Sequence, residues 1–295
     1  MTYPLRIGIG TGNRLPYPEL AGMWRSIEDL GFDTAWVVDH FLAGEDELTP
    51  YFEAWTLIAA LSQQTSRIRF GIMVSGNTYR NPALVAKEAV TIDHASGGRV
   101  ELGIGAGWWE REHQAYGYTF PPVRDRVEML EEAVQVISSL LTQERTTFHG
   151  AYYTFENTPF EPKSLQHPHL PIVIGASKPR MLRLAARYAD TWNTRGEPEE
   201  IAPLAETVRK AARDVGRDPD AIRLSVYAWK HPFTSEEHLR DIVARYHRAG
   251  FTDLIFPMPP AEDRPMMERL AREVIPELRA QYAPGAGAGA GVRAE

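Results

Sequence analysis

The stretch IRFGIMVSGNTYRNPALVAKEAVTIDHASGGRVELGIG, residues 68–105, joins two different patterns. Short apolar runs stand at its ends, IRFGIMV (68–74) and VELGIG (100–105), and the segment between them, ALVAKEAVTIDHASG (83–97), has the spacing of an amphipathic helix. Continuous apolar runs of this length are typical of strands that are buried on both faces of a parallel sheet. The stretch therefore predicts a strand–helix–strand unit.

The same alternation continues along the whole chain. Strands are expected at 5–10, 34–39, 68–74, 100–105, 171–176, 190–194, 222–229 and 252–258. Helices are expected at 18–31, 53–65, 83–97, 123–142, 179–190, 199–216, 235–250 and 266–280. Eight strands and eight helices in strict alternation predict an α/β fold, a single (β/α)8 TIM barrel.

A doubly wound open sheet is the alternative architecture. Such sheets usually carry a glycine-rich phosphate turn after the first strand, and GIGTGNRLP (8–16) offers three glycines there. However, Pro16 and Pro18 stand where the following helix should already be running. The barrel is therefore the favoured prediction.

Two insertions interrupt the alternation, at 106–122 after the fourth strand and at 143–170 before the fifth. Within the second, AYYTFENTPF (151–160) has the aromatic alternation of a small hairpin or edge strand. We expect one barrel domain over residues 1–282. The remaining residues, 283–295, form a low-complexity Gly/Ala segment that we expect to be disordered.

Composition narrows the class of protein. The 295 residues are 43% hydrophobic and 24% charged, as in ordinary globular proteins, and the formal net charge of −7 argues against nucleic acid as a main partner. No cysteine is present, which excludes disulfides and thiolate metal sites. No signal peptide or membrane span is recognisable, so we expect a cytoplasmic protein that does not bind membranes.

Two polar residues end the second expected strand, in WVVDHF (36–41). Asp39 and His40 are read either as a helix-capping residue with a surface histidine, or as an acid/base pair at the carboxyl end of a barrel strand, where catalytic residues lie. A metal site is not expected, because only His231 among the other histidines lies near a strand end.

Glycines follow the fourth and fifth strands. GIGAGWW (103–109) is read as a tight turn or as backbone that passes close to something flat or bulky. IGASKPR (174–180) leads directly into a helix, which favours an anion site, most naturally for a phosphate, over a simple turn. Aromatic residues near the same rim, Trp36, Tyr79, Trp108 and Trp109, indicate an aromatic-walled pocket or loop packing.

With these motifs assembled, the chain resembles the bacterial luciferase-like superfamily of flavin- and deazaflavin-dependent barrels. The resemblance covers roughly residues 5–260. It rests on VVDHF (37–41), MVSGNTYRNPALVAKEAVTIDHASGGRVELGIGAGWWEREHQAYG (73–117), HGAYYTF (149–155) and PIVIGASKPRMLRLAARYADTWN (171–193). It is strongest to the branch of coenzyme F420-dependent oxidoreductases, which use an 8-hydroxy-5-deazaflavin.

The resemblance implies catalytic residues. His40 matches the histidine near the reactive ring, which handles a proton as hydride moves, and Asp39 would support it. Sugar-phosphate dehydrogenases of the superfamily carry a catalytic glutamate directly after the strand-4 glycines. Here Trp108 occupies that position, and the candidate carboxylate is Glu110, two residues further on. A sugar phosphate is therefore not the expected substrate.

It also implies cofactor contacts. The third strand's end would carry a cis peptide not preceding proline that bulges against the ring, the residues after strand 4 would contact the cofactor's polar side chain, and the turn after strand 5 would hold its phosphate. The matching residues are Met73, Val74, Ser75, Asn77, Ala106, Gly107, Gly175, Ala176, Ser177 and Lys178. The basic residues that could serve an anionic cofactor tail are Lys178, Arg180, Arg14 and Arg80.

The expected activity is hydride transfer between coenzyme F420 and a small organic substrate. The alternative is an FMN-dependent luciferase-like monooxygenase that uses O2. A third reading, a barrel that only stores flavin, is disfavoured by the retention of His40. The resemblance also implies a homodimer that forms through the side of the second and third helices.

Overall fold

Eight parallel strands close into a barrel in the computed structural model, which describes residues 3–44 and 46–285. Around the barrel their order is β1, β2, β3, β5, β8, β9, β10 and β11, and β11 pairs with β1 to close the ring. The strands are β1 (Arg6–Gly10), β2 (Thr34–Val37), β3 (Arg69–Ile72), β5 (Val100–Gly105), β8 (Ile172–Gly175), β9 (Thr191–Thr194), β10 (Arg223–Tyr227) and β11 (Asp253–Pro257). The predicted TIM barrel is confirmed, and the open sheet is wrong because the additional pairing of β3 with β5 closes the ring, so that each of the eight strands has a neighbour on both sides.

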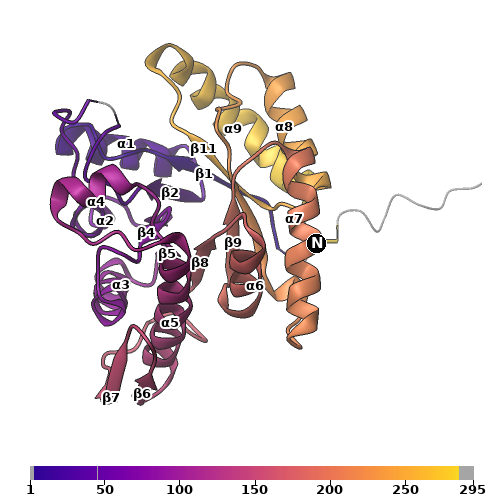
Figure 1. Cartoon of the computed structure of the whole chain (residues 1–295). Coiled ribbons are helices and arrows are strands. Elements are labelled where there is room, and N and C mark those ends of the chain that lie inside the picture. Colours follow the sequence, from indigo (N-terminus) through magenta and orange to yellow (C-terminus); the bar gives the residue numbers. More distant parts are fainter. Residues whose placement is uncertain (1–2, 45, 286–295) are drawn as a thin grey trace, which may run out of the picture.

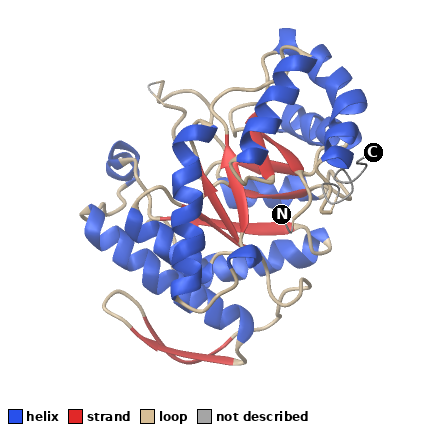
Figure 2. Cartoon of the chain, turned by 90° about the vertical axis from the view of Figure 1, so that its right-hand side faces the viewer, coloured by secondary structure: helices blue, strands red, loops and turns tan. Residues whose placement is uncertain are grey.

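Helices surround the barrel (Figures 1 and 2). They are α1 (Tyr17–Asp29), α2 (Ala54–Ser62), α3 (Pro82–Ser96), α4 (Glu110–Tyr116), α5 (Val123–Thr142), α6 (Pro179–Tyr188), α7 (Pro198–Asp214), α8 (Glu236–Arg248) and α9 (Arg264–Gln281), with 3-10 turns at Pro219–Ala221 and Ala261–Asp263. No helix in the described residues combines the length and the apolar character needed to cross a bilayer.

Local signals in the sequence set the ends of α3, the helix of the opening stretch. The side chain of Asn81 caps its start by accepting a hydrogen bond from the Ala83 amide at 2.9 Å, and Pro82 occupies the first turn. Gly97 ends it with φ of 68°, a left-handed conformation that glycine adopts without a side-chain clash. The helix therefore begins and ends where the sequence predicts.

Several strands end earlier than predicted, β2 and β3 among them. β2 stops at Val37 because the buried side chain of Asn13 takes over the hydrogen bonds of Val38, at 3.2 Å to its amide and 2.8 Å to its carbonyl. β3 stops at Ile72, and the Met73–Val74 peptide that follows is cis, as the resemblance implied. The chain then rejoins the sheet as the short strand β4 (Ser75–Gly76), which pairs with β5.

The two insertions lie at opposite ends of the barrel. Residues 106–122 contain α4, beside the carboxyl ends of the strands. Residues 143–170 contain an antiparallel hairpin, β6 (Arg145–His149) and β7 (Thr154–Pro159), which projects beside the lower part of α5 in Figure 1. The hairpin was expected, although it begins earlier in the chain. Residues 286–295 of the predicted tail lie outside the described residues, so their disorder stays a prediction.

Ion pairs fill the amino-terminal end of the barrel. Glu101 of β5 accepts hydrogen bonds from Arg6 and Arg69, both at 2.7 Å, and Arg6 also pairs with Asp253 at 2.8 Å. Burial alone raises the pKa of Glu101, but the two guanidinium groups outweigh it and hold the pKa at about 2. This end of the barrel is therefore closed by charges that compensate one another.

Replacing Glu101 with glutamine is expected to lower the free energy of unfolding by about 3 kcal/mol at pH 7, because Arg6 and Arg69 lose their shared partner. Folding lowers the pKa of Glu101, so its contribution is complete above its ordinary pKa near 4.5 and is lost as the pH falls towards 2. Urea unfolding at pH 7 and pH 3 checks this. The two proteins should converge at low pH, and the exposed Glu144→Gln should match wild type at both.

Apolar residues form the next layer of the barrel interior. Trp36, Met73, Val173 and Ile255 pack together from four different strands or strand ends, and all are almost fully buried. Val74 and Tyr227 are partly buried and pack against them. This layer forms a floor on which a bound molecule can rest at the carboxyl ends of the strands.

Candidate active site at the carboxyl ends of the strands

Two cavities open above this floor. The larger has a volume of about 760 Å³ and lies over the ends of β4, β5, β8 and β9. The smaller, of about 380 Å³, lies over the ends of β1 and β2. Three residues line both cavities, namely His40, Met73 and Trp108. A molecule in either cavity is therefore in reach of His40.

The larger cavity contains nearly all the residues that the sequence assigned to the site. Those that line it are Asp39, His40, Met73, Val74, Ser75, Ala106, Gly107, Gly175, Ala176, Ser177 and Lys178. Asn77 is buried beside it, where its Nδ2 donates to the hydroxyl of Tyr153 at 3.2 Å. The structure places Glu110 elsewhere than expected. Its exposed side chain accepts a hydrogen bond from Gln114 on the outside of α4.

His40 is held by Glu112, a residue that the sequence reading did not select. The two side chains meet between His40 Nδ1 and Glu112 Oε2 at 2.9 Å. Glu112 is fully buried, while the His40 side chain is 22% exposed towards the cavities. The edge-on rings of Trp108 and Trp109 flank the imidazole, with centroids 5.6 and 5.4 Å away. The imidazole is thus fixed in both position and tilt.

Glu112 is itself anchored from several sides. Its carboxylate accepts hydrogen bonds from the amides of Phe41 and Leu42, at 2.5 and 2.9 Å, and from the hydroxyl of Tyr79 at 2.5 Å. Burial alone raises the pKa of Glu112, but the hydrogen bonds from His40, Tyr79 and Leu42 outweigh burial and lower it. Glu112 is therefore ionised at neutral pH.

An ionised Glu112 fixes the tautomer of His40. A carboxylate accepts hydrogen bonds but donates none, so Nδ1 of His40 must carry the proton that joins the two groups. The other ring nitrogen, Nε2, is then the one that can take up or release a proton. The pair can act as a proton donor or acceptor towards a molecule bound in either cavity.

The resemblance implied that Asp39 supports His40, but the structure gives Asp39 other partners. Its carboxylate instead accepts hydrogen bonds from the Ser75 hydroxyl at 3.0 Å and the Gly76 amide at 2.9 Å, and it pairs with Arg80 at 2.6 Å. The expected support is thus corrected. Asp39 points into the barrel wall, where its carboxylate fixes the short strand β4.

Two glycines of β5, Gly103 and Gly105, pass close to another segment of the chain, the bulge at Met73–Val74. A side-chain carbon at Gly105 would lie 2.7 Å from Val74 Cγ2, and one at Gly103 would lie 1.9 Å from the carbonyl oxygen of Ile72. Both positions therefore need glycine so that the bulge at Met73–Val74 can fit against β5. Val74 then lies in the wall of the larger cavity.

The turn after β8 offers an anion site, with fewer amides than expected. The Ala176 amide already donates to the Asn193 carbonyl at 3.0 Å, which extends the pairing of β8 with β9. Ser177 and Lys178 are exposed at the start of α6, where the helix dipole favours negative charge. The site therefore rests on these two residues and the helix terminus.

Two of the four basic residues expected at the rim are already paired. Arg80 binds Asp39 and Glu53, and Arg180 binds Glu131 at 2.6 Å and also Glu128. Lys178 in the larger cavity and Arg14 in the smaller form no ion pair with any residue that the structure describes.

A further cation is Arg195, which follows the sixth strand but was not among the four basic residues expected to serve the cofactor tail. It lines the larger cavity and lies over the rings of Tyr227 and Trp229, at 5.4 and 4.8 Å from their centroids. Among the described residues it forms no ion pair, so a cation stacked on aromatic rings faces the cavity.

Only a weak signal in the sequence pointed to Glu112. It lies in the same short helix as Glu110, two residues further along, so the two side chains point to different faces of α4. Glu112 and His113 are buried whereas Glu110 is exposed. The phase of a seven-residue helix cannot be read from the sequence without knowing which face meets the barrel.

Known proteins of similar sequence include a dehydrogenase and a monooxygenase. An uncharacterized protein of Mycobacterium tuberculosis is 31% identical over 236 residues, covering 78% of this chain and 79% of that protein. The F420-dependent glucose-6-phosphate dehydrogenase of Amycolatopsis mediterranei is 27% identical, with 86% of this chain and 92% of that enzyme covered. The FMNH2-dependent dimethylsulfone monooxygenase of Pseudomonas putida is 29% identical, with coverages of 74% and 59%.

The fold is shared with solved structures of low sequence identity. An F420-dependent secondary alcohol dehydrogenase in complex with an F420–acetone adduct superposes with a TM-score of 0.85 at 20% identity, covering 94% of this chain and 99% of that one. The model of the luciferase-like monooxygenase family matches residues 3–291, nearly the whole sequence. The chain therefore belongs to the luciferase-like monooxygenase family of oxidoreductases.

Proposed function

We propose that the protein transfers hydride between coenzyme F420 and a small organic substrate, with His40 as the residue that donates or accepts the accompanying proton. The observation that carries this proposal is the His40–Glu112 pair, which presents one ring nitrogen at the junction of two cavities. One cavity can hold a cofactor and the other a substrate, so the proton-handling group stands between the two reactants.

The larger cavity fits the cofactor in chemistry as well as in size. Met73, Val74 and Trp108 offer an apolar wall to a flat ring, and Lys178 and Arg195 offer positive charge to phosphate and carboxylate groups. The hydroxyl of Thr194 also lines this cavity and is buried without a hydrogen-bond partner among the described residues. Such a group is explained by a polar ligand atom beside it.

When bound, a deazaflavin supplies or takes up a hydride. Reduction of a carbonyl group also needs one proton on the oxygen, and Nε2 of protonated His40 supplies it. In the reverse direction, Nε2 takes the proton of the alcohol. Glu112 keeps the imidazole oriented and stabilises its positive charge. Trp108 and Trp109 cover the imidazole and limit its contact with water.

An FMN-dependent monooxygenase is the second candidate, because the same cavity suits FMN and one relative in the family is an FMNH2-dependent enzyme. F420 is favoured by the two cations at the rim, since its longer tail carries more negative charge than FMN does. Titration of the purified protein with F420 and with FMN, followed by tryptophan fluorescence, separates the two. Tighter binding of FMN than of F420 would overturn the proposal.

Replacing Lys178 with alanine is expected to weaken cofactor binding about three- to tenfold at low salt, because one charged contact to the phosphate is lost. The effect should shrink as salt is added, since an exposed charge is screened. The same fluorescence titration measures it. Lys210→Ala, on the outer helix α7, is the matched control. An unchanged dissociation constant in Lys178→Ala would remove this residue from the phosphate site.

The expected dimer follows from the family resemblance, whereas the expected location rests on the sequence, in which no signal peptide or membrane span is recognisable. We propose a homodimer formed through α2 and α3, where Leu84 of α3 is 51% exposed and offers an apolar contact. The cytoplasm stays the predicted location.

A further inference from the structure

The smaller cavity differs from the larger in its walls. Aromatic rings dominate it, contributed by Trp36, Tyr51, Trp108, Trp109 and Tyr227. The rings of Trp108 and Trp109 are stacked at 11° with centroids 5.7 Å apart, so they present a flat surface. A planar molecule can lie against such a surface with the largest contact area. The cavity volume of about 380 Å³ limits that molecule to a compact size.

The polar groups of this cavity are hydrogen-bond donors and a cation. The hydroxyls of Tyr51 and Tyr227 have no hydrogen-bond partner among the described residues, and burial raises the pKa of Tyr51 to about 12, so its hydroxyl keeps its proton. Arg14 lines the same cavity and forms no ion pair within residues 3–44 and 46–285. None of the described residues that line the cavity carries a carboxylate. A bound molecule therefore meets donors and positive charge.

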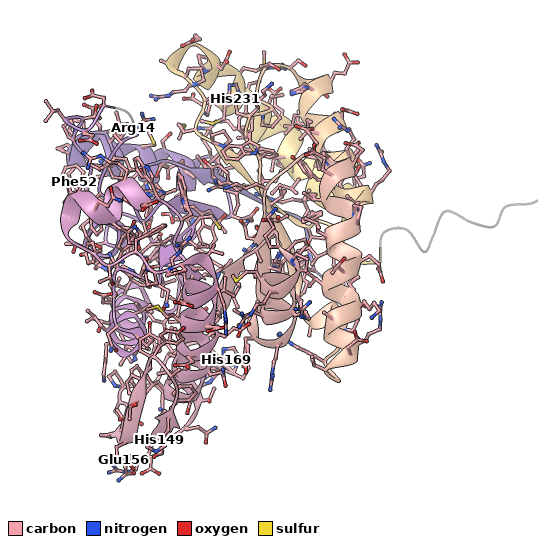
Figure 3. All side chains as sticks on the ribbon, viewed as in Figure 1. Arg14, Phe52, His149, Glu156, His169 and His231 are labelled. Atoms are coloured by element: carbon pink, nitrogen blue, oxygen red, sulfur yellow. The ribbon has the colours of Figure 1, made fainter. Side chains whose placement is uncertain are left out.

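Arg14 lies apart from the cations of the larger cavity. It follows β1, whereas Lys178 and Arg195 follow β8 and β9, and Arg14 does not line the larger cavity. Figure 3 places Arg14 at the end of the molecule opposite His149 and Glu156 of the hairpin. The anionic groups of a cofactor thus have their own partners, which leaves Arg14 for a second anion.

We propose that the smaller cavity binds the organic substrate, and that this substrate is a compact aromatic or conjugated carbonyl compound that also carries a carboxylate. The carbonyl group lies at His40 and the carboxylate at Arg14. The inference rests on the proposed function, because His40 gives the carbonyl oxygen its proton while the reduced cofactor gives the carbonyl carbon a hydride. The products are the alcohol and the oxidised cofactor.

Binding of two probes tests the substrate class. They are 4-carboxybenzaldehyde and its neutral methyl ester, and quenching of tryptophan fluorescence reports on their binding with and without cofactor. We expect wild type to bind the acid more tightly than the ester. Arg14→Gln should weaken binding of the acid about three- to tenfold at low salt and leave the ester within about twofold. Arg25→Gln, on the outer face of α1, should bind both like wild type.

Other outcomes overturn the inference and are distinguishable from failure of the proposed function. If Arg14→Gln binds the acid as wild type does, or if the wild type prefers the ester, the carboxylate assignment is wrong. If Arg14→Gln instead weakens binding of F420 but not of FMN, Arg14 serves the cofactor tail. Failure of wild type to bind either cofactor defeats the proposed function, whereas cofactor binding without probe binding defeats only the substrate class.

Discussion

His40→Ala is expected to lower kcat by about two to four orders of magnitude while the dissociation constant of the cofactor changes only a few-fold. The proton that accompanies hydride transfer then has no donor or acceptor within reach, since the donors nearest the smaller cavity, Tyr51 and Tyr227, keep their protons at neutral pH. Cofactor affinity is maintained because His40 is one of many groups that line the larger cavity.

Steady-state kinetics and a fluorescence titration of the same preparation measure the two quantities separately. His238→Ala is the control, because His238 is exposed on α8 and lies in neither cavity. Loss of cofactor binding, with hydride transfer unchanged in the protein that remains loaded, would make His40 a binding residue and not a proton-handling one.

Glu112→Gln is expected to lower kcat about 10- to 100-fold with little change in KM, because the glutamine keeps the shape of the side chain but not its charge. Its amide group can donate a hydrogen bond to Nδ1 of His40, which moves the ring proton to Nε2. The proton-exchanging nitrogen is then the wrong one. We also expect a loss of stability of about 1–3 kcal/mol, since two backbone amides and the Tyr79 hydroxyl share the same carboxylate.

NMR spectra of the protein labelled with 15N-histidine distinguish this role from a purely structural one. Wild type should carry the His40 proton on Nδ1, and Glu112→Gln should carry it on Nε2. Glu110→Gln is the matched control, since Glu110 lies in the same helix and is exposed. Equal losses of activity in the two variants, or an unchanged tautomer in Glu112→Gln, would contradict the assignment.

Periodic patterns in the sequence were sufficient for the fold. Eight apolar runs with helices between them predict the barrel. A strand that is buried on both faces has continuous apolar residues, whereas a helix that is buried along one stripe has apolar residues three or four positions apart. Barrel topology then places the end of every strand on one face, so Asp39, His40 and the residues from Gly175 to Lys178 could be assigned to the site in advance. The cis peptide at Met73–Val74 came from the family resemblance, not from spacing.

The partners of these residues were not predictable in the same way. Adjacent residues at a strand end point in different directions, so Asp39 pairs with Arg80 while His40 pairs with Glu112, 72 residues away. Likewise, Arg80 and Arg180 are neutralised by neighbours from other elements, whereas Arg14 and Lys178 have no ion-pair partner in the described part of the chain.

The sequence by itself thus determined the barrel, the face that bears the site and most residues that line it. Only the tertiary structure decided which carboxylate holds His40, which cations remain free and that two cavities meet there. The physical reason is the range of the interactions. Strand and helix patterns repeat over a few residues and can be recognised from neighbouring positions in the sequence. A hydrogen bond or ion pair at the site depends instead on angles and distances that exist only once the barrel has closed.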